Sequence, residues 1–484
     1  MGPIDRLPIQ PLKPAFRNAY HTPEQLDRLK QATLDILENV GVQFQSDKAL
    51  DLLAEHGVHV DRATKVARFP PQVVLDAMAK APRRFPLGAR DPLCDIAVGD
   101  GNTYCTTDGC GVEIIDFATR ERRQSTKADL ADVTRMQDYL SSMAFWWPTV
   151  SAGDHGETAQ LHELDAGWNN TVKHLQGMVN GEREARYAVE MATVIAGGPE
   201  ELRRRPVLSD LIGTISPLVH DKDGIEAALV FAAAGIPVTF VTMPTLGTTA
   251  PATKAGAYAL GAAELVSGTV LLQLASPGAP VLHSIMQSWA DPRSGSFVSH
   301  PQDGRSRALG TELAHHWGVP AESATCGTDS PLPGTWQAGV EEALDFVQAA
   351  QEGSDLLPSI GLVNIYTLFY PEHLILGDDI YQRARYAIMD IELDDESVAL
   401  EAIAEVGPGG HFLGNKHTRR HMRAAVAPAI THQPGPDGAF RDPLEVAREK
   451  AEWIWREYRP EPLDAGKAAE LTKILAAADA ELRA

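Results

Sequence analysis

The chain has 484 residues, of which 44% are hydrophobic and 22% charged, and its formal net charge is -22. This length allows a large core or two domains, and the composition is that of an ordinary globular protein. The acidic charge argues against nucleic-acid binding, which needs clustered Lys and Arg. No signal-peptide core opens the chain, and charges, Pro or Gly interrupt each apolar run, so we expect a cytoplasmic protein without a membrane segment.

Four cysteines are too few for a disulfide framework in so long a chain: Cys94, Cys105, Cys110 and Cys326. Cys105 and Cys110 enclose "CTTDGC", a spacing that matches no common zinc motif. We interpret this segment as a turn.

Residues 1–140 are predicted to form an N-terminal extension. Residues 22–25 (TPEQ) have the pattern of a capping box that begins a helix, and short helices are expected over 47–55 and 71–80. The segment 95–124 then alternates and turns in the manner of a β-meander.

Residues 141–484 show a different pattern: apolar runs of strand length alternate with amphipathic helices. The seven predicted strands lie within 143–150, 174–180, 208–216, 236–244, 279–289, 321–329 and 356–364. Residues 425–433 are a weak eighth, and 371–423 are a long helical interruption. Repeated βα units require parallel strands, so the α/β fold expected is a closed (β/α)8 TIM barrel with C-terminal helices. A doubly wound sheet is the alternative.

The exit of the fourth predicted strand is rich in hydroxyls and nearly uncharged. Residues 240–253 read "FVTMPTLGTTAPAT", with Pro244 ending the strand and Thr253 suited to cap the next helix. In barrels the C-terminal ends of the strands carry the active site. Pro and Gly could also simply end the strand here, with the hydroxyls as caps.

Two other patterns are weak. "EVGPGGHFLG" (405–414) would suggest the Gly-rich turn of an S-adenosylmethionine methyltransferase only if a strand preceded it, but the residues before it have helical periodicity. We therefore interpret Gly407 as a helix stop. Five histidines have no spacing typical of a metal site, so no bound metal is expected: His315, His316, His411, His417 and His421.

Aromatic and neutral polar residues gather near the predicted strand exits. An aromatic face attracts an alkylammonium ion with about 1–2 kcal/mol when the pair is desolvated. The candidate substrate-binding residues are Trp146, Trp147, Gln176, Asn180, Ser216, Thr242, Gln287, Trp289, Asp329, Trp336, Asn364 and Tyr366. Any single Trp among them could equally be a core residue.

Several blocks resemble the trimethylamine methyltransferase family from about residue 29 to the C-terminal helices. They include "ISPLVHDKDG" (215–224), "MPTLGTTAPATKAG" (243–256) and "EVGPGGHFLGNKHT" (405–418). The resemblance implies a TIM barrel that moves a methyl group from a methylated amine to the Co(I) corrinoid (cobalamin) of a partner protein. Members that act on trimethylamine carry pyrrolysine, and members without it are similar to enzymes that demethylate quaternary amines such as glycine betaine.

This chain contains no pyrrolysine, so the resemblance implies a quaternary amine as the substrate. Gly247, Thr248 and Thr249 are expected to face the corrinoid, no metal is expected to bind the chain directly, and a homo-oligomer is expected. Catalytic side chains are not assigned, because Co(I) is itself the nucleophile. The alternative is a betaine-binding or regulatory protein of the same fold that transfers no methyl group.

Two segments depart from the family's pattern. The block after "TDS" has Pro331 and Thr335 where the family has Lys and then an Asp before "QAG", and Gln302 replaces a common Glu. All three lie on predicted strand-exit loops, where substrate identity is decided.

Overall fold

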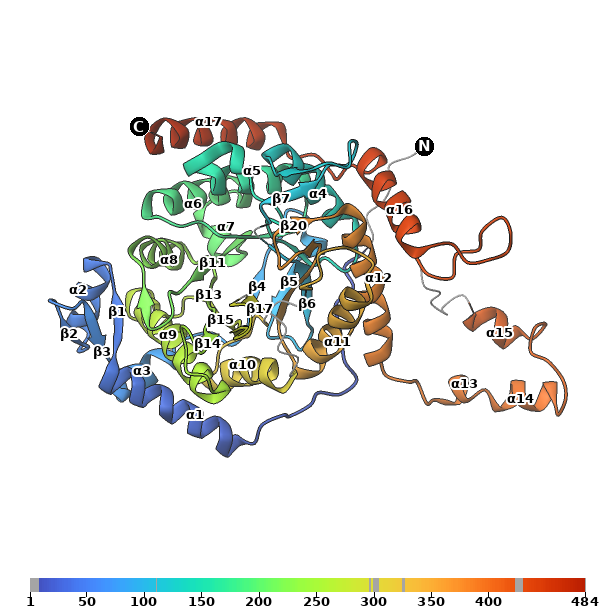
Figure 1. Ribbon diagram of the computed structural model, residues 1–484, viewed down its shortest axis with the longest axis horizontal. Helices are drawn as coiled ribbons and strands as arrows, with labels where there is room; N and C mark the ends of the chain where they lie inside the picture. Colours follow the sequence, from blue (N-terminus) through green and yellow to red (C-terminus); the bar gives the residue numbers. More distant parts are fainter. Residues whose placement is uncertain are drawn as a thin grey trace.

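The computed structural model describes residues 8–109, 111–295, 297–298, 304–323, 327–422 and 430–483. Within these residues, eight parallel segments pair side by side into a ring (Figure 1). In chain order they are β6 (Tyr104–Thr107), β9 (Phe145–Trp146), β10 (His174–Gly177), β11 (Leu208–Gly213), β13 (Val238–Thr242), β15 (Val281–Ile285), the bridged residues 321–322 and β18 (Leu356–Ile360). The ring closes because β18 pairs with β6, which is bridged through Cys105 to Met143 just before β9.

A helix follows each of these segments and packs outside the ring. These helices are α4 (Lys127–Tyr139), α5 (Ala159–Asn170), α6 (Glu182–Ala196), α8 (Lys222–Ala234), α9 (Lys254–Ala275), α10 (Gly304–Trp317), α11 (Trp336–Glu352) and α12 (Pro371–Ile388). The short α7 (Pro199–Arg204) lies between α6 and β11. The predicted (β/α)8 barrel is confirmed.

The sequence prediction missed the first βα unit of the barrel. The first barrel strand is β6, within the predicted meander, so the strand over 236–244 is the fifth and not the fourth. Cys105 lies in β6 and not in a turn, and Cys110 lies outside the described residues. Of the weak eighth strand, 425–429 lie outside the described residues and 430–433 are not a strand. The domain division at residue 140 stays a prediction.

The residues before the barrel cover two of its faces. The elements α1 (Pro23–Asp35), the π-helix η1 (Ile36–Val40), β1 (Val42–Phe44), α2 (Asp47–Glu55), β2 (His59–Asp61), β3 (Val66–Arg68) and α3 (Pro71–Met78) precede the hairpin β4 (Phe85–Leu87) and β5 (Ile96–Val98). Thr22 forms the predicted capping box with Gln25. The helices α1, α2 and α3 pack on α9, and β1 pairs with β12 (Val219–His220).

This cover explains the composition of α9. Packed between the barrel and the extension, α9 is buried over 83% of its most apolar window and is apolar enough to pass for a membrane span. The expectation that no apolar run reaches that length was therefore wrong, but the cause is burial on two sides within the fold.

The N-terminal end of the barrel is sealed by apolar side chains. Phe85 and Leu87 of the β4–β5 hairpin form one cluster with Phe145, Leu282 and Leu356, which point inward from three barrel strands. Access to the barrel interior is therefore from the opposite end, where the strands finish.

Short elements lie at the strand exits. They are β7 (Glu113–Ile115), β8 (Arg122–Gln124), β14 (Thr245–Leu246), β16 (Ser288–Ala290), β17 (Phe297–Val298), β19 (Leu362–Val363) and β20 (Leu368–Phe369), with the 3-10 turns η2 (Pro92–Cys94) and η3 (Gly153–Thr158) elsewhere. They form two small sheets, in the orders β14-β16-β17 and β19-β20-β7-β8.

The C-terminal residues form an arm and two packed helices. The arm carries α13 (Asp395–Val398), α14 (Leu400–Val406) and α15 (Lys416–His421), and Figure 1 shows it standing away from the barrel. The last helices, α16 (Pro443–Glu457) and α17 (Ala465–Leu482), pack on α12 and α6. Gly407 ends α14, so the predicted helix stop is confirmed.

Candidate active site

A polar cluster lies inside the barrel. Gln176 of β10 donates from Nε2 to Oε2 of Glu322 at 2.9 Å and to Oγ1 of Thr239 at 3.2 Å. Thr239 of β13 donates to the same carboxylate oxygen at 2.9 Å. These three residues come from strands that are not neighbours, so their side chains meet across the interior.

The cluster holds one carboxyl group with unused hydrogen-bonding capacity. All three side chains are buried, and Oε1 of Glu322 and Oε1 of Gln176 have no partner among the described residues. Burial raises the pKa of Glu322 to about 7, although the bonds from Gln176 and Thr239 favour the charged form. Such a group changes its charge readily when a cation arrives, which is typical of a functional site.

An apolar layer lies between this cluster and the strand exits. Val241 follows Thr239 by two residues on the same strand, so it shares the inward face one step nearer the exit. It packs with Trp147 and Leu211, against Met178 and Met286. Nε1 of Trp147 has no partner among the described residues. A carboxyl beneath an indole and aliphatic walls suits an organic cation.

The structure separates the two adjacent tryptophans. Trp147 faces the barrel interior, whereas Trp146 points outward and donates from Nε1 to Oγ1 of Thr134 on α4 at 2.9 Å. Successive strand residues face opposite sides, so only one of the two can line the interior. Trp146 ends β9, but its side chain packs in the helix layer and not in the interior.

Ser216 and Thr242 serve a different network. Both donate to Oε2 of Glu264, as Thr214 does, while the backbone N–H of Leu218 donates to Oε1. Glu264 is buried on α9, so these hydroxyls fasten the exits of β11 and β13 to that helix.

The remaining predicted residues are spread over the exit end. Asn180 is exposed, Trp289 on β16 is 40% exposed, and Trp336 at the start of α11 is 83% exposed. The backbone N–H of Asp329 donates to Glu341. The amide of Gln287 is buried and has no partner among the described residues, so Gln287 has groups left for a ligand.

Asn364 and Tyr366 lie in a strained turn between β19 and β20. Asn364, Ile365 and Tyr366 all have left-handed φ angles, between 55° and 60°, which non-glycine residues rarely adopt. Tyr366 also packs closely on the exit of the seventh barrel segment, where a Cβ on Gly327 would lie 2.6 Å from Cε1 of Tyr366 and 2.8 Å from Oδ2 of Asp108. Strain of this kind is concentrated at functional sites.

The exit loop of β13 is a tight turn of small residues. The backbone N–H groups of Thr248, Thr249 and Ala250 donate to the carbonyl of Thr245, and Gly247 has φ +81°. Thr248 is exposed, and a Cβ at Gly247 would meet nothing within 4 Å. Thr253 occupies the N-cap position of α9 but makes no side-chain capping bond.

The structure describes two of the three residues that differ from the family's pattern. Thr335 caps α11 by accepting from the N–H of Ala338, and Pro331 is exposed on the same loop. Gln302 lies outside the described residues.

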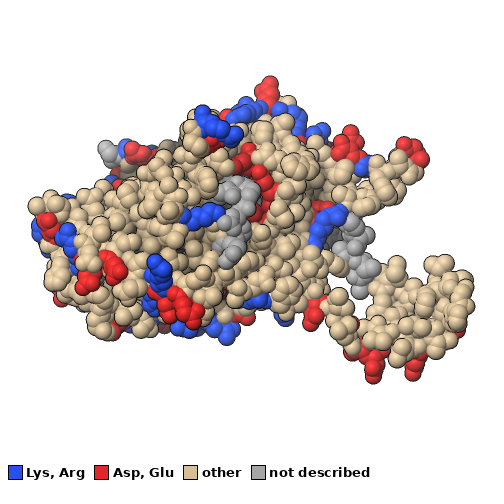
Figure 2. Space-filling model, turned by 60° about the horizontal axis from the view of Figure 1, so that its bottom comes forward, with Lys and Arg blue, Asp and Glu red and all other residues tan. Residues whose placement is uncertain are grey.

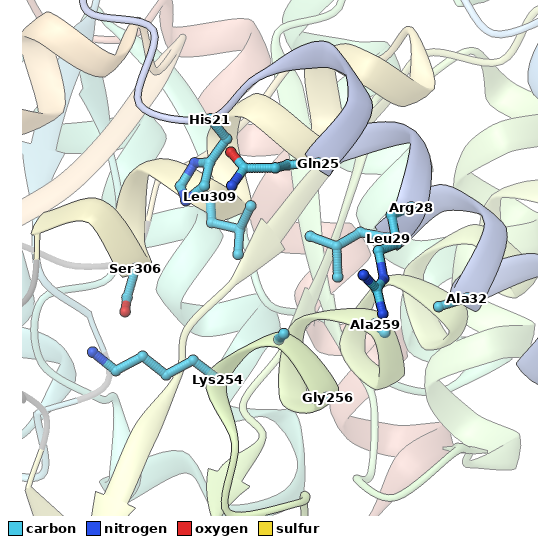
Figure 3. A pocket seen from close by; sticks show the side chains of 11 residues that line it. His21, Gln25, Arg28, Leu29, Ala32, Lys254, Gly256, Ala259, Ser306 and Leu309 are labelled. Carbon is cyan, nitrogen blue, oxygen red and sulfur yellow. The ribbon is translucent and has the colours of Figure 1, made fainter.

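A separate cavity of about 680 Å³ lies outside the barrel, between α1 and the first turns of α9 and α10. Figure 3 shows Arg28 and Lys254 among its lining side chains. It shares no residue with the cluster around Glu322.

Glu322 and Thr239 were not predicted from the sequence. The available signal was Glu322 near the start of the predicted strand "AESATCGTD", because a carboxylate is rarely fully buried in a barrel strand unless it is paired.

The fold and the cluster define a (β/α)8 barrel protein with a buried acid beneath an apolar, aromatic layer at its C-terminal end. A model of the trimethylamine methyltransferase (MTTB) family matches residues 9–482. A trimethylamine methyltransferase of Desulfitobacterium hafniense is 32% identical over 466 residues, covering 95% of this chain and 94% of that protein. The chain belongs to the trimethylamine methyltransferase family, as the resemblance indicated.

The chain is also similar to a second methyltransferase and to a solved structure. The glycine betaine methyltransferase of Desulfitobacterium hafniense Y51 is 28% identical over 463 residues, covering 94% of this chain and 96% of that protein. The crystal structure of the Methanosarcina barkeri monomethylamine methyltransferase is 11% identical, with a TM-score of 0.44, and covers 95% of this chain and 92% of that one.

Proposed function

We propose that this protein transfers a methyl group from a quaternary amine of the glycine betaine type to the Co(I) corrinoid of a partner protein. The observation that carries this proposal is the pairing of Glu322 with the apolar layer around Trp147. A carboxyl and an indole together recognise a cation that offers methyl groups in place of hydrogen-bond donors.

The chemistry favours a quaternary over a tertiary amine. A tertiary amine is a poor methyl donor until its nitrogen gains positive charge, whereas a quaternary ammonium already carries that charge. The 484 residues are all of the ordinary twenty types, so no unusual side chain is available to activate a tertiary amine. One relative is named for trimethylamine and another for glycine betaine, so the names alone do not decide.

The exit loop of β13 fits the approach of a broad, flat corrinoid. Thr248 is exposed, and a Cβ placed on Gly247 would meet nothing within 4 Å. When bound, the Co(I) corrinoid supplies the nucleophile that takes the methyl group. The chain itself then needs no nucleophilic side chain.

The residues of the barrel bind and orient the amine. Gln176 and Thr239 fix Oε2 of Glu322, which leaves Oε1 to face the cation. Trp147, Leu211 and Val241 exclude water from the same space. As the C–N bond breaks, its electron pair stays on nitrogen and a neutral amine leaves, so catalysis consists of positioning and desolvation.

A substrate panel tests this function. Protein is incubated with glycine betaine, choline or trimethylamine and free Co(I) cobalamin, and methylcobalamin is followed by its absorbance. We expect transfer from a quaternary amine, lost in Glu322→Gln and kept in the matched control Glu163→Gln, a buried acid on α5 outside the cluster. Binding of a quaternary amine with no transfer to cobalamin or to a corrinoid protein would support the binding or regulatory alternative.

A further inference from the structure

Three potential metal ligands meet in the arm between α12 and residue 422. Glu396 lies in α13, and His417 and His421 lie one turn apart in α15. One ring nitrogen of each histidine and one carboxylate oxygen all lie within 4.8 Å of one another. The sequence did not predict this, because Glu396 is distant along the chain and only the fold brings it to the histidines.

The separation between His421 and Glu396 is close to that of two ligands of a bound transition metal. Nε2 of His421 lies 3.2 Å from Oε1 of Glu396. Ligands at about 2.0–2.1 Å from a tetrahedral Zn²⁺ lie about 3.3 Å from each other. The two imidazole rings lie side by side, stacked with centroids 4.2 Å apart.

Nε2 of His417 also lies 3.0 Å from the carbonyl oxygen of Glu396. A histidine that donates one ring N–H to a backbone carbonyl has its other nitrogen free to accept, which is the usual arrangement of a metal-ligating histidine. If Nε2 keeps this contact, Nδ1 of His417 is the nitrogen that is available to the metal.

The arm has no core that would hold it in place. None of its three helices has a buried residue, and each has seven residues or fewer. Helices so short are not stable alone in water. Small modules without a core are commonly held by a structural metal. Figure 2 shows the arm apart from the body, with few charged side chains on the face in view.

We propose that Glu396, His417 and His421 bind a divalent transition metal, with Zn²⁺ as the best match, and that the metal fixes α13 against α15. Water completes the coordination, since the three residues are only partly buried or exposed. Arg420, which also bonds to Oε1 of Glu396, is 65% exposed and can move into solvent. The proposal is independent of methyl transfer and replaces the expectation that the chain binds no metal.

The test uses the full chain after removal of metals with a chelator. Zn²⁺ is titrated by calorimetry into wild type, His417→Ala, His421→Ala and the control His411→Ala, an exposed histidine of the same arm outside the cluster. We expect one Zn²⁺ per chain in wild type and in the control, and at least about tenfold weaker binding in the two ligand variants. Hydrogen exchange across residues 389–422 should slow with Zn²⁺ only where binding is kept.

Equal Zn²⁺ affinity in all four proteins would overturn the proposal, because the metal would then sit elsewhere. Absence of stoichiometric binding at micromolar Zn²⁺, with exchange in the arm unchanged, would overturn it as well.

Discussion

Trp147 is the residue expected to contribute an aromatic face to the cation. Replacement by Leu keeps much of the bulk but removes the ring quadrupole, so affinity for a quaternary amine should fall by about 1–2 kcal/mol. Trp453→Leu is the matched control, because Trp453 lies on α16 outside the barrel strands and is 40% exposed. Calorimetry with glycine betaine measures both variants. Equal losses in the two, or none in Trp147→Leu, would remove Trp147 from the proposed site.

Glu322 gives the site a dependence on pH. Its pKa is about 7 in the fold and lower in the unfolded chain, so between about pH 4.5 and 7 the folded state binds more protons. This group's contribution to the free energy of unfolding therefore decreases as the pH rises through that window, by on the order of 3 kcal/mol.

Urea unfolding of wild type and Glu322→Gln between pH 4 and 8 measures this effect. The variant should gain stability relative to wild type as the pH rises towards 7, and the difference should then level off. All other titrating groups are common to both proteins and cancel in the comparison. A difference that does not vary with pH would show that Glu322 has an ordinary pKa.

The sequence did not show which of two adjacent strand residues points into the barrel. Gln176 and Trp147 were predicted and lie in the interior, but Trp146 was predicted on equal grounds and faces α4. Strands of a parallel barrel are buried on both faces, so their sequence does not reveal which residues point inward. Glu322 and Thr239 were missed for the same reason.

Among the elements, the alternation of strands and helices was predictable, because most strands are apolar runs and each following helix is amphipathic or apolar. The exception is β6, which has the sequence "YCTT" and lies among turn signals. Only its pairing with β18, more than two hundred residues later in the chain, makes it a barrel strand. Such long-range pairing leaves no local pattern in the sequence.

Helix α9 is tied to two strand exits through Glu264. Replacing Glu264 with Ala would leave the hydroxyls of Thr214, Ser216 and Thr242 and the N–H of Leu218 without their acceptor. We expect a loss of about 2–4 kcal/mol in the free energy of unfolding. Chemical denaturation measures it, with Glu190→Ala on α6, which is largely exposed, as the control. A loss no greater than that of the control would mean that the network contributes little.

The proposed corrinoid-facing role of the β13 exit loop is better tested at Thr248 than at Gly247. Gly247 has a left-handed φ, so any side chain there is strained whatever its function. Thr248 is exposed and has no such constraint, so Thr248→Phe should keep the melting temperature and the affinity for the amine while slowing methyl transfer to a corrinoid. Unchanged transfer in this variant would show that the loop does not face the corrinoid.

Across the whole molecule, the three proposed functions belong to different parts of the chain. The barrel interior binds the amine, the strand exits receive the corrinoid, and the arm with Glu396 lies apart from both (Figure 1). The acidic charge of -22 is compatible with a cationic substrate, but a solvated acidic surface is the commoner explanation for it.

The most direct measurement follows the methyl group itself. Glycine betaine labelled with carbon-13 in its N-methyl groups is incubated with the protein and Co(I) cobalamin, and both products are observed by NMR. We expect labelled methylcobalamin and dimethylglycine in equal amounts with the wild type and neither product with Glu322→Gln. Label that remains entirely on bound glycine betaine, while the same protein methylates cobalamin from trimethylamine, would contradict the assignment of a quaternary amine.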